Sequence, residues 1–339
     1  MLHRRNRNNA ANFIAVDWGS SNFRAYVVDE LGRVGQRTKA HQGIARVKDE
    51  SFPKTIRRLL GKWFNKYPET SVIMSGMIGS RQGWQEVAYV SCPATIEAIA
   101  AGTEKIVNHT FERDIYIVPG LKLARGNDDF DIMRGEEIQA FGALQELPPA
   151  DRHLICLPGT HTKWVEIRNG EIVNFKTFVT GEIFSLLARY SILSSNMDGV
   201  AYHPEIFAKG LKLVMQSDDL FGDIFKVRIQ ALLGKLRPAE VSSYLSALLI
   251  GTEIKSAQKM FGDIKNIAVV AAPWLSEMYE QCLAPLGITV TGIKTDQASV
   301  NGLLQIFKLL PDSQDDEVEV GNKAETIKSV TPAQHFAWN

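Results

Sequence analysis

Residues 14–29 read IAVDWGSSNFRAYVVD, and this stretch decides the predicted fold. An apolar run ends in the carboxylate of Asp17, a polar turn follows, and a second apolar run completes the pattern of a β-hairpin. Gly19 lets a ligand approach the backbone closely, while the N–H groups and hydroxyls of Ser20 and Ser21 can donate to anionic oxygens. Asp17 can hold Mg²⁺ through water. Taken alone, these residues also fit an ordinary surface hairpin, because short motifs arise by chance.

A similar stretch occurs a second time in the chain. Residues 16–22 read VDWGSSN and residues 156–162 read CLPGTHT, so both place glycine and hydroxyl side chains in a turn after an apolar strand. Each turn is followed by a second strand, another turn and a third strand. The repetition predicts a duplicated unit of three strands, whose two polar turns face each other across a cleft and hold a polyphosphate between them.

The composition is that of a soluble globular protein without a nucleic-acid partner. The chain has 339 residues, 45% of them hydrophobic and 22% charged, and 38 Lys and Arg balance 38 Asp and Glu. A neutral balance lacks the basic surface that nucleic acids attract. No apolar run reaches membrane-spanning length, and the basic N-terminus lacks the apolar core of a signal peptide. We therefore expect no membrane partner.

The cysteines indicate the compartment. Cys92, Cys156 and Cys282 are far apart and show no zinc-ligand spacing. Free thiols are typical of a reducing environment, so we expect a cytoplasmic protein. A homodimer is left open as the oligomeric state.

Alternating helix and strand patterns predict an α/β fold in two domains. Apolar spacing predicts helices at 53–67, 183–193, 240–260, 276–284 and 298–309, and another that begins near Glu136. Short strands are expected at 71–74, 115–118, 267–271 and 288–291, and a polar loop at 122–131. The predicted segments are a flexible N-terminus at 1–12, a first domain at 13–148, a second domain at 149–310 with a helical insertion at about 183–262, and an acidic tail at 311–339 outside the core.

Two carboxylates begin the helix near residue 136. Glu136 and Glu137 precede the apolar stripe of that helix, where negative charge complements the helix dipole. The alternative is that one of them is a general base at the mouth of a cleft. Position alone favours the dipole interpretation. Gly79 lies in a loop of small residues, 75–80, which permits either the approach of a ligand or close packing.

Several rare strings, in this order, resemble the 2-dehydro-3-deoxygalactonokinases of the actin and sugar-kinase superfamily. They are AVDWGSSNFR at 15–24, GMIGS at 76–80, MRGEE at 133–137, LPGTHTKWV at 157–165, TGE at 180–182 and LLIGTEI at 248–254. The resemblance implies two ribonuclease-H-like domains, each a β-β-β-α-β-α-β unit, with a cleft between them. It also implies phosphorylation of the 6-hydroxyl of 2-dehydro-3-deoxy-D-galactonate, a sugar acid of galactonate catabolism, by ATP with Mg²⁺.

The resemblance implies roles for the two turns and for a third segment. Asp17 serves the metal and the reaction, and Lys163 supplies positive charge for the phosphoryl group. The residues expected to hold phosphate are Gly19, Ser20, Ser21, Gly159, Thr160 and Thr162. The corner containing Ala271 and Pro273 occupies the place of the adenosine motif, where the superfamily favours glycine.

The resemblance also favours Glu136 as the general base, with Glu137 as the alternate. Because the substrate is a carboxylate, Arg24 or Arg134 is expected to pair with it, although each fits a structural salt bridge equally well. Gly79 and His161 complete the expected substrate site, and a turn-stabilising role fits His161 as well. The remaining alternatives are a kinase for another sugar or sugar acid and a non-catalytic nucleotide-binding paralogue.

Overall fold

The computed structural model describes residues 12–47, 50–107 and 110–311. Of the predicted terminal segments 1–12 and 311–339, all but Asn12 and Pro311 lie outside the described residues. Contacts join the chain up to Leu309 into one compact unit. The predicted boundary between domains near residue 148 stays a prediction.

The first sheet contains six strands in the order β3-β2-β1-β4-β7-β6. They are β1 (Phe13–Trp18), β2 (Phe23–Val28), β3 (Val34–Ala40), β4 (Ser71–Ser75), β6 (Glu104–Lys105) and β7 (Ile115–Ile117). β1 pairs antiparallel with β2 and parallel with β4. Every residue of β1 is buried, as expected for a nearly continuous apolar run in the middle of a sheet.

The second sheet repeats this arrangement in the order β12-β11-β10-β13-β14. Its strands are β10 (Arg152–Leu157), β11 (Thr162–Arg168), β12 (Glu171–Phe178), β13 (Asn266–Val270) and β14 (Thr289–Ile293). β10 pairs antiparallel with β11 and parallel with β13, so β10 takes the place that β1 has in the first sheet. The α/β fold of two ribonuclease-H-like units, predicted from the repeated hairpin and the resemblance, is confirmed.

The prediction of a polar loop at 122–131 is wrong. β8 (Leu121–Ala124) and β9 (Phe130–Met133) are antiparallel neighbours in a small sheet with β5 (Val90–Ser91). Buried side chains alternate with exposed ones along β8, a strand pattern that its two polar or small positions conceal. In β9, the Asp131 carboxylate accepts a hydrogen bond of 2.8 Å from the Thr177 N–H and so ties this sheet to β12.

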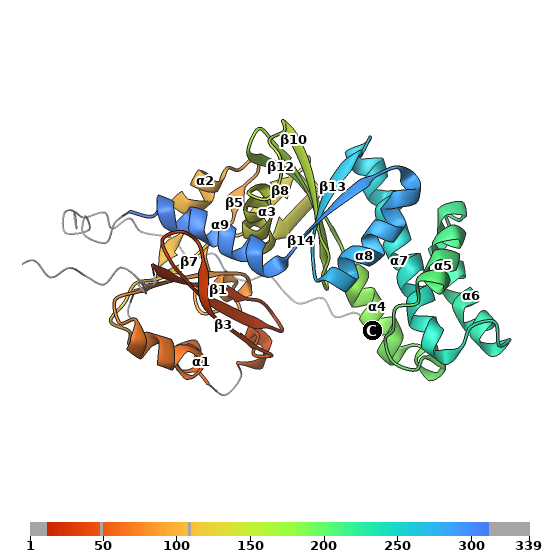
Figure 1. Cartoon of the computed structure of the whole chain (residues 1–339), viewed down its shortest axis with the longest axis horizontal. Coiled ribbons are helices and arrows are strands. Elements are labelled where there is room, and N and C mark those ends of the chain that lie inside the picture. Colours follow the sequence, from red (N-terminus) through yellow and green to blue (C-terminus); the bar gives the residue numbers. More distant parts are fainter. Residues whose placement is uncertain (1–11, 48–49, 108–109, 312–339) are drawn as a thin grey trace, which may run out of the picture. The chain divides into compact units, whose positions relative to one another are not determined.

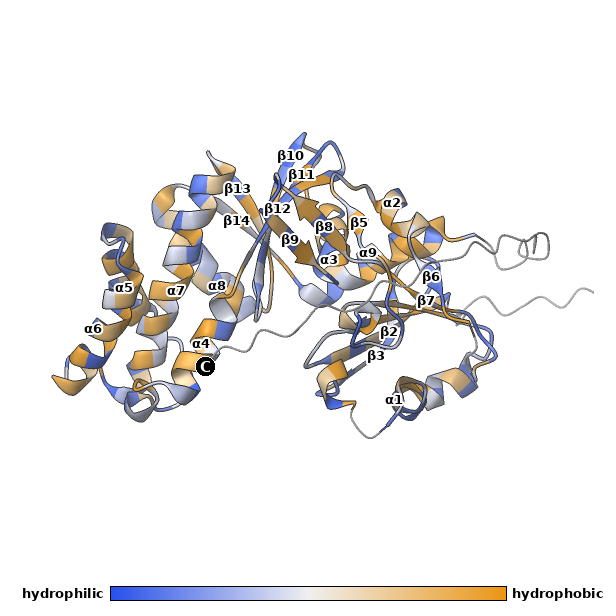
Figure 2. Cartoon of the chain, turned by 180° about the vertical axis from the view of Figure 1, so that it is seen from behind, coloured by the Kyte–Doolittle hydropathy of each residue, from blue (hydrophilic) through white to orange (hydrophobic). Residues whose placement is uncertain are grey.

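The helices accompany the sheets and fill the connection between β12 and β13 (Figure 1). The helices are α1 (Phe52–Lys66), α2 (Ile96–Ala101), α3 (Glu136–Leu144), α4 (Thr180–Tyr190), α5 (Pro204–Gln216), α6 (Leu220–Leu232), α7 (Pro238–Phe261), α8 (Pro273–Leu283) and α9 (Thr295–Leu309). Of these, α4 to α7 form the connection between β12 and β13. α4 begins at Thr180 rather than at the predicted residue 183. Hydrophobic residues recur along α5, α6 and α7 (Figure 2), and most of α7 is buried in a core shared with α8 and the second sheet.

α3 and α9 cross in close contact, although they are far apart in the chain. A Cβ atom on Gly142 would lie 1.8 Å from the Ala298 carbonyl oxygen, and one on Gly302 would lie 2.0 Å from the Ile138 carbonyl oxygen. α9 also packs on β1 and β4, where the rings of Phe13 and Phe307 stack at 4.8 Å. Only glycine at the positions of Gly142 and Gly302 lets the backbones of α3 and α9 approach this closely.

Candidate active site

The first polar turn, residues 19–22, joins β1 to β2. Trp18 pairs with Phe23, and the Gly19 N–H donates to the Asn22 carbonyl at 3.0 Å. The short helix at Ile44–Arg46 packs against this turn, and the Ala45 N–H donates to the Ser20 carbonyl at 3.2 Å. The Ser20 and Ser21 side chains remain exposed. The turn is thus fixed through its carbonyl groups, and its two hydroxyls face solvent.

Asp17, the residue before the last of β1, is a buried carboxylate with one cationic partner. Its Oδ2 accepts a hydrogen bond of 2.9 Å from Nη1 of Arg24, whose side chain is about one-third exposed. Burial raises the pKa of Asp17, and the positive charge of Arg24 acts in the opposite direction. Arg24 is thereby engaged with Asp17, which supports the salt-bridge alternative for this arginine over a substrate contact.

Two glycines bring the start of α3 close to the end of β1. Gly135, the N-cap of α3, has a φ of +110°, and a Cβ there would lie 3.1 Å from the Gly76 Cα. Gly76 has a φ of +94°, and a Cβ there would lie 2.9 Å from the Trp18 carbonyl oxygen. Both conformations and both contacts require glycine. They place Glu136 in the region that Asp17 borders, and the charge of Glu136 contributes to the raised pKa of Asp17.

The two glutamates at this helix start have different environments. Glu136 accepts a hydrogen bond of 3.1 Å from the Arg134 N–H, and its Oε1 lies 3.5 Å from Nζ of Lys163. Its side chain is 28% exposed. Glu137 is fully buried, and its two oxygens accept from the Gly135 N–H at 2.8 and 2.7 Å. Burial, with the nearby charge of Glu136, raises the pKa of Glu137 to about 8.

Arg134 is a buried cation with unused donors. Its Nη2 donates to the Val87 carbonyl at 2.8 Å, and its guanidinium stacks on the Tyr89 ring at 4.1 Å. Its Nε and Nη1 are buried and have no hydrogen-bond partner among the described residues. A Cβ on Gly79 would lie 3.0 Å from Nη1, so this glycine lets the guanidinium pack closely against the backbone. Such unsatisfied donors are expected to meet an anion or water.

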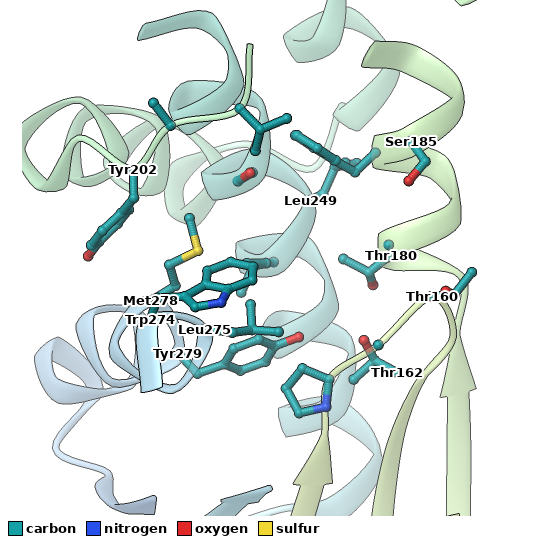
Figure 3. Close-up of a pocket in the computed structure, with 18 residues that line it drawn as sticks. Thr160, Thr162, Thr180, Ser185, Tyr202, Leu249, Trp274, Leu275, Met278 and Tyr279 are labelled. Atoms are coloured by element: carbon teal, nitrogen blue, oxygen red, sulfur yellow. The ribbon is translucent and has the colours of Figure 1, made fainter. Parts of the chain in front are cut away.

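The second polar turn, residues 158–161, joins β10 to β11 and borders a cavity of about 520 Å³. Gly159, Thr160 and Thr162 line it on one side, together with Thr180 of α4. Figure 3 shows the opposite side, where Trp274, Leu275, Met278 and Tyr279 project from α8. Ala271 and Pro273, expected at the adenosine corner, are not among the lining residues; their neighbours Trp274 and Leu275 are.

Lys163 and His161 of this second hairpin contact different carboxylates. Lys163 is 5% exposed, and its Nζ approaches Glu136. His161 is exposed, and its Nε2 lies 2.7 Å from Oε2 of Glu182 in α4, so it links the turn to that helix. This contact supports the turn-stabilising alternative for His161.

Sequence reasoning did not single out Glu253 of α7. This carboxylate is 2% exposed and lies behind the cavity wall, where it accepts hydrogen bonds from Trp164 and Tyr279, both at 2.8 Å, and from Thr180. The signal was present in the sequence, because Glu253 is the one charged residue in the stretch 241–254. Trp274 and Tyr279 were also missed, because aromatic residues on a helix most often belong to the core.

The described residues contain neither a membrane-spanning helix nor a preformed cluster of metal ligands. In that part of the chain, no helix is both long and apolar enough to cross a membrane. Over the same ranges, no group of three or more His, Cys, Asp or Glu side chains is arranged to hold a metal ion.

Comparison with known proteins gives a consistent result. A family model described as 2-keto-3-deoxy-galactonokinase matches residues 17–306. The chain is 32% identical to the 2-dehydro-3-deoxygalactonokinase of Escherichia coli over 296 residues, which cover 87% of this chain and 97% of that protein. It is 34% identical over 298 residues to a Rhizobium meliloti protein assigned the same activity, covering 87% of this chain and 96% of that one.

A solved structure agrees with these relatives. A crystal structure of a Sinorhizobium meliloti protein assigned the same activity superposes with a TM-score of 0.80 at 33% sequence identity. The match covers 87% of this chain and 97% of that one. The chain therefore belongs to the 2-keto-3-deoxy-galactonokinase family.

Proposed function

We propose that this protein transfers the γ-phosphoryl group of ATP to the 6-hydroxyl of 2-dehydro-3-deoxy-D-galactonate. Family membership supports the substrate and the reaction. The observation that carries the proposal for the site is the approach of Glu136 to Lys163, at 3.5 Å. This contact places the partly exposed carboxylate of Glu136 beside the ammonium group of Lys163, which follows the polar turn at the cavity.

Glu136 is the proposed general base, and it takes the proton from the 6-hydroxyl as that oxygen attacks phosphorus. Its side chain is 28% exposed and so accessible to a substrate, whereas Glu137 is fully buried. Lys163 then stabilises the charge that develops on the transferred group. Phosphoryl transfer needs mainly positioning and charge neutralisation, and these side chains supply both.

The cavity is the proposed nucleotide site. Trp274 is 57% exposed and provides an aromatic face on which a base can stack. The turn at Gly159 and Thr160 lies at the other side of the cavity, where backbone N–H groups can hold phosphate oxygens.

Asp17 is the residue proposed to hold Mg²⁺. Proteins typically bind this ion through one or two carboxylates together with substrate phosphates, so a single buried carboxylate fits it. When bound, the ion would neutralise charge on the phosphates. Arg24 keeps the Asp17 side chain oriented through their hydrogen bond of 2.9 Å.

Arg134 is the residue proposed to bind the carboxylate of the sugar acid. Its buried Nε and Nη1 have no partner among the described residues, and each can donate a charge-assisted hydrogen bond to a carboxylate oxygen. The absence of a side chain at Gly79 lets the guanidinium take this position, because a Cβ there would lie 3.0 Å from Nη1. Neither observation depends on the resemblance to the family.

A coupled assay with ATP, MgCl₂ and a panel of 2-keto-3-deoxy sugar acids tests the proposal. We expect ADP release that depends on the galactonate-derived acid, with the product phosphorylated at O6 by NMR. A preference of tenfold or more for another acid would reassign the substrate. ATP binding without turnover on any acid would favour the non-catalytic paralogue.

We propose a cytoplasmic location for the protein. Cys92, Cys156 and Cys282 are free thiols, which fits a reducing compartment. The homodimer stays a prediction.

A further inference from the structure

Glu253 is a buried carboxylate surrounded by neutral hydrogen-bond donors. Its Oε1 accepts from Nε1 of Trp164 and from the hydroxyl of Tyr279, each at 2.8 Å, and its Oε2 accepts from the hydroxyl of Thr180. The partners come from β11, α4 and α8, so one side chain of α7 holds three other elements.

No Lys or Arg forms an ion pair with Glu253 among the described residues. Burial raises the pKa of Glu253, while the hydrogen bonds from Thr180, Trp164 and Tyr279 act in the opposite direction. Burying a carboxylate without a cation is unfavourable, and a neutral side chain of similar size would fill the same space. A purely structural role therefore accounts poorly for a carboxylate at this position.

The residues around Glu253 differ in whether they line the cavity. Thr162, Thr180 and Tyr279 line the cavity, whereas Trp164 is fully buried and is not among the lining residues. Glu253 thus lies directly behind the hydroxyl groups of the proposed nucleotide site.

We propose that Glu253 is a positioning residue for the nucleotide: it accepts the hydroxyl proton of Thr180 and thereby turns the lone pairs of that hydroxyl toward the cavity. This inference rests on the proposed function of the cavity. A hydroxyl has one proton, and a hydroxyl that donates to Glu253 can only accept on its other side. Thr180 then accepts from a ribose hydroxyl of ATP, and the phosphates are bound by the backbone of the turn at Gly159.

Replacing Glu253 by Gln tests this directly in the full-length protein. Trp164 can only donate, so the amide oxygen must stay on its side, and the amide NH₂ then faces Thr180. Thr180 becomes an acceptor and turns its own proton into the cavity. We expect the Kd for ATP with MgCl₂, measured by calorimetry, to rise at least tenfold, while the KM for the sugar acid changes less than twofold. An unchanged Kd for ATP would overturn the proposal.

Trp164→Phe is the matched control, because it removes a donor to the same carboxylate without touching the cavity. We expect a lower Tm and a Kd for ATP within twofold of the wild type. If this variant weakens ATP binding as much as Glu253→Gln does, Glu253 acts only through general stability and the proposal fails.

Thr180→Val and Thr180→Ser keep the proposal testable if Glu253→Gln does not fold. The valine variant should raise the Kd for ATP tenfold, and the serine variant should stay within threefold, because it retains the hydroxyl. Equal affinities of the two variants would refute the role of the hydroxyl. A wild type that binds ATP but phosphorylates no sugar acid would overturn the proposed function alone, whereas a wild type that does not bind ATP would overturn both.

Discussion

Nζ of Lys163 lies 3.5 Å from Oε1 of Glu136, so the second hairpin meets the start of α3. The side chains of Lys163 and Glu136 are 6% and 28% exposed, so the cation is shielded from water while the carboxylate stays accessible. The proposed base and the cation proposed for the phosphoryl group are thereby adjacent. Two separate parts of the sequence contribute to the proposed reaction site.

Glu136→Gln should lower kcat at least 100-fold, because Gln keeps the size of the side chain but cannot take the proton of the sugar hydroxyl. The Kd for ATP should stay within threefold. Steady-state kinetics and calorimetry measure the two quantities. Full turnover in this variant would exclude Glu136 as the base.

Glu137→Gln should change the pH dependence of stability rather than turnover. The pKa of Glu137 is raised from 4.5 to about 8 in the folded state, so between these values the folded protein holds a proton that the unfolded chain has released. Unfolding free energy therefore falls as pH rises through this interval, by up to about 1.4 kcal/mol per pH unit. Because Gln does not titrate, this decrease in unfolding free energy with rising pH should be absent from the Glu137→Gln variant.

Urea denaturation at pH 5 and pH 8 tests the effect. The wild type should lose more stability between the two conditions than the Glu137→Gln variant does, since other titrating groups are common to both proteins. Equal losses in the two proteins would show that Glu137 is ionised throughout this range.

Arg134→Lys should raise the KM for the sugar acid at least tenfold and leave the Kd for ATP unchanged. Lys keeps the charge but lacks the two-pronged geometry that binds a carboxylate. Arg113→Lys is the matched control. Arg113 also stacks on an aromatic ring, Phe64, at 4.2 Å, but it donates to three backbone carbonyls and has a structural role. The control should lower the Tm only; a KM effect of similar size in both variants would count against a substrate contact at Arg134.

Asp17→Asn should reduce turnover at least 100-fold at saturating ATP and MgCl₂, because Asn cannot supply the charge that the metal needs. The Tm should change little, since water can reach the partly exposed Arg24. Asp29→Asn is the control: Asp29 pairs with Arg33 at 2.7 Å at the other end of the same hairpin and should be neutral for turnover. Normal activity of Asp17→Asn would remove Asp17 from the site.

The local parts of the fold could be predicted from the sequence. The turn at Gly19 and the turn at Asn169-Gly170 lie between apolar runs, and the conformations they need are set by neighbouring residues. Gly170 and Asn169 have φ angles of 83° and 51°, as such a turn requires. The repeat of the hairpin unit then predicted the three strands that begin each of the two larger sheets, β1 to β3 and β10 to β12.

Contacts between distant segments could not be predicted in this way. Glu253 occupies a regular position on a long helix, and only the fold shows that Trp164 and Thr180 converge on it. Likewise, Gly142 and Gly302 read as ordinary helix interruptions until α3 and α9 are seen to cross. Periodicity indicates which face of a helix is buried but not which element buries it.

The position of α9 has a consequence for the order in which the protein can be made. α9 packs on β1 and β4, and Tyr26 of β2 donates to Asp296 in its first turn at 2.8 Å. The first sheet thus leaves the ribosome with part of its apolar face uncovered, and the helix that covers it is synthesised last among the described elements. Until release, the nascent N-terminal half exposes strands that a chaperone could hold, and a chain cut before residue 295 would keep them exposed.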